Sequence, residues 1–197
     1  MRKRVKQMDE RFNQDNYVIR KKFWQFLGAT VFVETPDGQP VMNAKLKAFK
    51  LKEDIRLYAD EARTKEILRI GARKIIDLGI TYDVFDSATN QKIGSVKRKG
   101  WKSILQDEWE IWDANEQVIG TVKEDSMLMA LLRRFLTNLI PQNFHMTDAN
   151  GGQIGFVKQN FNPFTVKLNA QFQNSTVDRR LAVVAVVMLA AIEQRQG

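Results

Sequence analysis

Residue types that commonly carry out enzymatic chemistry are scarce in this chain. It contains no cysteine and a single histidine, His145, so thiolate chemistry, disulfides, zinc–thiolate sites and multi-histidine metal sites are excluded. No second histidine can act with His145 as base or ligand, which favours a structural role. Carboxylates are plentiful, but none are paired in an apolar setting as glycosidase-like chemistry requires. We therefore expect no enzyme activity, no cofactor and no metal.

Two Asp-x-Asn sequences have the form in which a calcium-binding loop begins: Asp113-Ala-Asn115 and Asp148-Ala-Asn150. An EF-hand loop needs further oxygen ligands and a glutamate at its twelfth position, which counted from Asp113 is Glu124. The residues between them have the pattern of a strand, so hairpin turns are the better interpretation. Gly151-Gly152 also lies between strands, without the following helix that a phosphate-binding loop requires.

Basic side chains gather with aromatic ones in two short stretches. The first contains Arg20, Lys21, Lys22 and Trp24, and the second contains Lys97, Arg98, Lys99, Trp101 and Lys102. Such clusters attract anionic lipid, with Trp at the membrane interface, and the same composition can contact nucleic-acid phosphates. A third interpretation is a solvated strand edge, where lysines deter edge pairing.

The whole chain is basic, with 31 Lys and Arg against 23 Asp and Glu in 197 residues and a net charge of +8. This balance favours an acidic partner, either anionic lipid or nucleic acid. Residues 1–16 form a basic arm that is either a solubilising tail or an electrostatic docking segment. The arm has no apolar region typical of a secretory signal. We therefore expect a cytoplasmic protein, either free or on the inner face of a membrane.

The strongest pattern in the chain is a repeated hairpin. Each unit is a strand, a turn led by Asp, an Ile-Gly pair and a return strand that ends in Val-Lys. The units are Tyr82–Asp86 with Lys92–Lys97, Trp109–Asp113 with Val118–Lys123, and Phe144–Asp148 with Gln153–Lys158. The glycine of each return strand, Gly94, Gly120 or Gly155, marks a bulge or a close backbone approach. Counted along the chain, the pattern predicts about twelve short strands in meander order.

An unbroken apolar run, Leu181–Ile192, closes the chain. Its composition favours a helix capped by Ser175 or Thr176. Twelve residues give a helix of roughly 18 Å, short for a bilayer core of about 30 Å. Because it is apolar on all sides it must be buried on all sides, so we expect a central helix at 177–193 surrounded by strands.

A second helix is predicted near 126–139, ending before Pro141. It carries a polar stripe with Arg133 and Arg134. Two roles are open for it: closing one end of the barrel, or lying on a membrane surface with the two arginines at the headgroups.

These hairpins followed by a terminal apolar helix resemble the tubby C-terminal-like superfamily, in its phospholipid scramblase and LURP-one-related branch. The resemblance runs from about Tyr17 to Ile192 and implies a mainly β fold at 17–197, a closed antiparallel barrel of about twelve strands around the terminal helix. The chain departs from scramblases in having no cysteines for palmitoylation and no carboxylate from Asn169 to Thr176. Calcium-dependent scrambling is therefore not expected.

The combined expectation is a non-enzymatic module that binds anionic phospholipid at a membrane surface. Its lipid contacts would be the two basic clusters together with Arg133 and Arg134. Two alternatives remain: lipid scrambling or transfer with the terminal helix in the bilayer, and a soluble barrel that binds a protein or, less favoured, a nucleic acid. The oligomeric state is left open.

Overall fold

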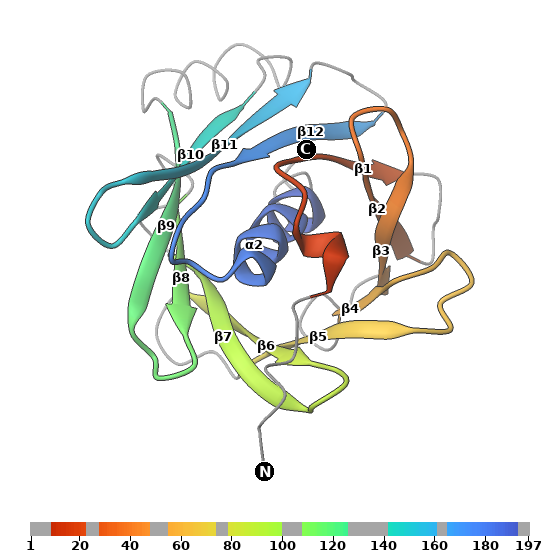
Figure 1. The fold of residues 1–197 in the computed structure, drawn as a ribbon, viewed down its shortest axis with the longest axis horizontal. Coiled ribbons are helices and arrows are strands. Elements are labelled where there is room, and N and C mark those ends of the chain that lie inside the picture. The colour runs from red at the N-terminus through yellow and green to blue at the C-terminus, as the bar shows by residue number, and fades with distance from the viewer. Residues whose placement is uncertain are drawn as a thin grey trace.

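The protein folds as a closed barrel of twelve antiparallel strands around one helix (Figure 1). The computed structural model describes residues 9–22, 28–47, 55–73, 79–99, 108–125, 142–160 and 165–192. The strands are β1 (Asn16–Lys22), β2 (Gly28–Glu34), β3 (Pro40–Lys47), β4 (Ile55–Tyr58), β5 (Glu66–Ala72), β6 (Ile80–Asp86), β7 (Gln91–Arg98), β8 (Glu108–Asp113), β9 (Val118–Glu124), β10 (Asn143–Asp148), β11 (Gln153–Asn160) and β12 (Val166–Phe172). Each strand pairs with its sequence neighbours, and β1 pairs with β12 to close the ring. The predicted fold class and meander order are confirmed.

The repeated glycines lie where the pattern predicted a bulge. In each of the three hairpins the register shifts by one residue beside the glycine, leaving Ile93, Ile119 or Ile154 without a Cα partner across the hairpin. These isoleucines pack in or against the core. A bulge increases the local twist of a strand pair, which helps a sheet to close into a barrel.

The helix α2 (Arg179–Ile192) fills the middle of the barrel, as the view down the ring shows (Figure 1). From Leu181 to Ala191 no side chain is more than 3% exposed. Strand alternation supplies the surrounding wall, because every second side chain of a strand points to the same face. The prediction of a buried central helix is confirmed. The prediction of its N-cap was wrong, because Asp178 rather than Ser175 or Thr176 accepts the backbone N–H of Arg180, at 2.9 Å.

Both ends of α2 are held by polar contacts. At the start, Arg180 donates to Asp178 and to Asp86 at the end of β6. At the end, the Lys21 ammonium donates to the carbonyl oxygen of Ala191 at 2.9 Å, inside the barrel. A cation at this position complements the negative end of the helix dipole.

The segment before β1 packs against the barrel. A 3-10 turn, η1 (Glu10–Phe12), buries Phe12 in the core at 2% exposure, and the Tyr17 hydroxyl donates to the carbonyl oxygen of Arg11. Residues 9–16 of the segment expected as an arm are thus ordered here, whereas residues 1–8 lie outside the described residues.

The barrel has two distinct ends. The hairpin end carries the described turns between strand pairs, at 35–39, 59–65, 87–90, 114–117 and 149–152, and the link 173–178 to α2. The opposite end, where odd-numbered strands finish, is called the lysine end below. The helix expected near 126–139 lies outside the described residues. Among the residues described, no helix is long and apolar enough to cross a membrane.

Candidate functional site: the lysine end of the barrel

Charge is segregated along the barrel. The hairpin end (9–15, 34–40, 59–66, 86–92, 113–118, 148–153 and 173–180) carries 13 Asp and Glu against six Lys and Arg. All other described residues together carry 14 Lys and Arg against five Asp and Glu. Within the described residues, acidic side chains are therefore concentrated at the hairpin end and basic ones in the rest of the barrel wall, a distribution that orients a protein in the field of a charged surface.

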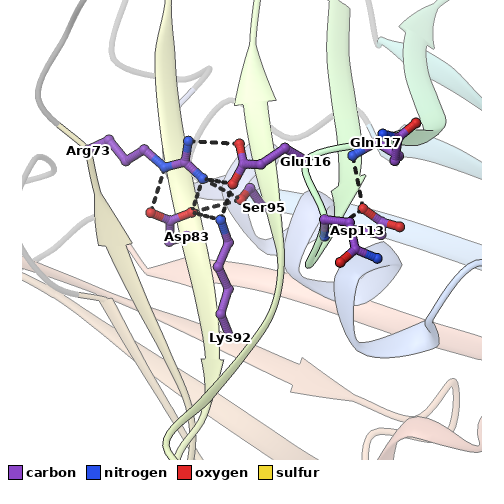
Figure 2. A network of polar contacts seen from close by, with 8 residues as sticks. Arg73, Asp83, Lys92, Ser95, Asp113, Glu116 and Gln117 are labelled. Atoms are coloured by element: carbon purple, nitrogen blue, oxygen red, sulfur yellow. Dashed lines mark hydrogen bonds and ion pairs between the residues drawn. The ribbon is translucent and has the colours of Figure 1, made fainter.

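The repeat explains this segregation. The Asp of each unit closes a turn at the hairpin end. The carboxylate of Asp113 accepts the backbone N–H of Asn115 at 2.8 Å and that of Gln117 at 2.9 Å (Figure 2). Asp86 and Asp148 accept equivalent turn bonds. The Lys of each unit, Lys97, Lys123 or Lys158, lies one or two residues before the end of the return strand, at the other end of the barrel. It follows a buried valine, so strand alternation directs it outward.

The first basic cluster predicted from the sequence is divided by the barrel wall. Arg20 points outward and forms a two-pronged pair with the carboxylate of Glu34. Lys21 points inward, where it is 6% exposed and bonded to the end of α2. Lys22 is the last residue of β1, its side chain and Trp24 lying outside the described residues. Alternation along β1 therefore places Arg20 and Lys21, which are neighbours in the sequence, on opposite faces of the barrel wall.

The second cluster is divided in the same way. Lys97 lies over the ring of Trp112, with 5.0 Å between Nζ and the ring centroid. Lys99 donates to Glu108 at 2.7 Å and lies 3.0 Å from Glu110, and the first of these bonds is the main cause of its raised pKa. Arg98 lies between them, on the same face of β7 as the buried Val96. Trp101, Lys102, Arg133 and Arg134 lie outside the described residues.

The outer wall of β11 and β12 carries a compact basic patch that was not predicted from the sequence. It consists of Lys158 and Asn160 on β11 and of Lys167 and Asn169 on β12, and is called the lysine–asparagine patch. Lys158 is the register partner of Asn169, and Asn160 is the partner of Lys167, which places the two lysines on one diagonal. On the other diagonal the Asn169 amide donates to the Asn160 carbonyl at 2.6 Å. Within the described residues, neither lysine has a carboxylate within 4 Å.

Comparison with known proteins places the fold in a family. The family model described as LURP-one-related matches residues 15–190. The chain belongs to the LURP-one-related family. A crystal structure of a protein from Arabidopsis thaliana is similar, with a TM-score of 0.52, 13% sequence identity and coverage of 90% of this chain and 93% of that one. At this identity the likeness concerns the fold alone. No curated protein sequence matches the chain.

A second polar cluster of this LURP-one-related barrel lies on the opposite wall (Figure 2). Arg73 donates two bonds of 2.6 Å to Asp83 and also bonds Glu116 from the β8–β9 turn. Lys92 pairs with the same two carboxylates. The Ser95 hydroxyl, in a residue with no exposed surface, donates to Asp83. Two cations match two anions, so the cluster ties β6, β7 and the β8–β9 turn together and leaves no net charge for a ligand.

The pKa values of this cluster agree with a structural role. Burial alone would raise the pKa of Asp83, but hydrogen bonds from Arg73, Lys92 and Ser95 lower it to about 2. Bonds from Arg73 and Lys92 also lower the pKa of Glu116 to about 2. Both groups stay ionised at neutral pH and are unsuited to moving protons there.

His145 lies beside the lysine–asparagine patch on the outer face of β10. Its Nε2 pairs with Asp125, and its ring lies 5.0 Å from that of Phe156. The side chain is 49% exposed, and its register partner on β9 is Lys123. Lys123 and His145, together with the lysine–asparagine patch and Arg20, form a band of nitrogen-bearing side chains across β9, β10, β11, β12 and β1.

Proposed function

We propose that this protein is a non-enzymatic module that docks on anionic phospholipid surfaces with its lysine end. The observation that carries the proposal is the segregation of charge, which turns the basic end toward an anionic surface and the acidic end away from it. The lysine–asparagine patch supplies two lysines that are not neutralised by a described carboxylate, and we assign it as the centre of the contact.

The burial of α2 favours docking over insertion of this helix. Its side chains from Leu181 to Ala191 form the core of the barrel. Moving the helix into a bilayer would expose the inward faces of all twelve strands to water, at about 25 cal/mol for each Å² of apolar surface. Peripheral contact needs no such rearrangement.

The strength of the contact follows from the number of lysines. A basic residue near an anionic membrane contributes about 1 kcal/mol. Neutralising either Lys158 or Lys167 should therefore weaken binding about fivefold, and neutralising both should weaken it about 30-fold. Salt screens exposed charges, so binding should also fall steeply as ionic strength rises.

The test is cosedimentation of the full chain with phosphatidylcholine vesicles that either contain or lack an anionic lipid, at low and high salt. The variants are Lys158→Gln, Lys167→Gln and the double substitution. The matched control is Lys65→Gln, because Lys65 is an exposed lysine at the hairpin end. We expect salt-sensitive binding to anionic vesicles alone, lost in the double variant and unchanged within about twofold in the control. All variants should have the same Tm as the wild type.

Three results would overturn the proposal. The first is binding to neutral and anionic vesicles alike, which would remove the electrostatic basis. The second is equal loss in Lys65→Gln and Lys158→Gln, which would remove the assignment to the lysine end. The third is salt-sensitive binding to a short DNA duplex with none to vesicles, which would make the protein a nucleic-acid-binding barrel.

A further inference from the structure

A long stretch of this chain contains no carboxylate. Between Asp148 and Asp178 there is no Asp or Glu, while nine Asn and Gln and two Lys occur. The described part of this stretch includes β11 and β12, so the outer wall of both strands presents ammonium and carboxamide groups without an acid. The next strand around the ring, β1, carries no carboxylate either, which makes three consecutive strands without one.

One other pair of adjacent strands, β3 and β4, also lacks carboxylates. There, however, Arg56 of β4 pairs with Glu66 of β5 at 3.0 Å. On β3, Lys45 faces this paired Arg56, whereas in the lysine–asparagine patch both cations lack such a partner among the described residues.

Within the described residues, the hydrogen bonding of the patch uses one of its amide donors. One N–H of Asn169 is used by the Asn160 oxygen, so of the four amide N–H groups in the two side chains, three remain beyond this bond. Directly opposed residues in an antiparallel pair have Cβ atoms about 5 Å apart, and diagonal ones about 7 Å. Two ammonium groups therefore flank a pair of amides within the dimensions of one phospholipid headgroup.

Two carboxylates next to the neighbouring strands β1 and β10 already have partners there. Arg20, the partner of Lys167 on β1, holds Glu34, and His145 on β10 holds Asp125. The described wall thus offers an incoming headgroup cations and amides without a free anion.

We propose that the lysine–asparagine patch selects anionic lipids whose headgroups carry phosphate and hydroxyl groups but no amine. A phosphate accepts from the lysines, and hydroxyls exchange hydrogen bonds with the amides. Phosphatidylserine has the same net charge, but its ammonium meets two lysine ammonium groups and no carboxylate, and like charges at this separation repel. The inference rests on the proposed membrane docking and specifies the lipid.

The experiment compares vesicles of equal surface charge that contain phosphatidylglycerol, phosphatidylinositol or phosphatidylserine. Exposed charge pairs change affinities by a few-fold, so the wild type should bind the first two about two- to fivefold more tightly than the third. Asn160→Asp introduces a carboxylate while keeping the oxygen that accepts from Asn169. It should abolish or reverse this ratio. Asn115→Asp, the same change in an exposed turn at the hairpin end, should leave the ratio unaltered.

The possible results separate this inference from the docking proposal. Equal binding to all three anionic vesicles, or an unchanged ratio in Asn160→Asp, would overturn the headgroup preference and leave membrane docking intact. Binding to none of the anionic vesicles would overturn both. A ratio that changes equally in Asn115→Asp would show an effect of total charge and would also overturn the role of the patch.

Discussion

Gly94, in the return strand of the first repeat unit, has no room for a larger side chain. A Cβ at this position would clash with the backbone carbonyl oxygen of Trp112 and lie 2.6 Å from Cδ1 of Leu181. The carbonyl belongs to β8 and cannot rotate away, and Leu181 is fully buried in α2. Overpacking of a core costs about 1–3 kcal/mol, and a clash with backbone belongs at the upper end. Gly94→Ala should therefore lower the free energy of unfolding by about 3 kcal/mol and Tm by about 6–12 °C.

The barrel provides controls for this substitution. At Gly71 nothing lies within 4 Å of the position that a Cβ would occupy, and the backbone conformation is ordinary, so Gly71→Ala should be neutral or stabilising by up to about 1 kcal/mol. A Cβ at Gly120 or Gly155 would approach a neighbouring carbonyl oxygen at 3.0 or 2.9 Å, so these alanine variants should fall between. Urea unfolding and calorimetry measure the series. If Gly94→Ala were as stable as Gly71→Ala, the close approach of β8 and α2 would be refuted.

Three further changes test other parts of the molecule. Val186→Asp should prevent folding, because an unpaired charge in the dry core is very costly, and an unchanged Tm would refute the central position of α2. Lys21→Met should cost about 1–3 kcal/mol in urea unfolding by removing the charged donor to Ala191, whereas an unchanged midpoint would mean that the helix end is held otherwise. Because its folded pKa is lowered to about 2, Asp83 should contribute stability that is present above its unfolded pKa of about 4 and lost as pH falls toward about 2. Asp83→Asn should flatten this part of the curve of stability against pH, and an undiminished slope would mean that Arg73 does not hold an ionised Asp83.

Much of the fold was predictable from the sequence because the repeat and the terminal run are local signals. The Asp-led turns and the Ile-Gly bulges recur at nearly constant spacing, and a fully apolar helix too short for a bilayer has to be enclosed by protein. The start of α2 was misplaced, however. Ser175, Thr176 and Asp178 are all good N-caps, and only the packing of Arg180 between Asp178 and Asp86 selects Asp178.

The candidate site was less predictable, since adjacency in sequence is not adjacency on a strand face. Successive residues of a strand point to opposite sides, so Lys21 and Arg20 separate although they are neighbours. The lysine–asparagine patch has the opposite property. Lys158 and Lys167 belong to different strands and meet only through the register of β11 and β12. The sequence did hold one signal, the lysine that follows valine near the end of every return strand of the repeat.

The two ends of the barrel differ in what folding requires of them. The aspartates at the hairpin end accept backbone N–H groups of their own turns, so the acidic end follows from the way the chain turns. No such requirement applies to Lys158 and Lys167, whose side chains have no described hydrogen-bond or ion-pair partner. Neutral polar residues at these outward positions would serve the fold equally well, and substituting them should leave stability within about 0.5 kcal/mol. We therefore assign these two lysines to the proposed contact with an anionic surface rather than to the fold.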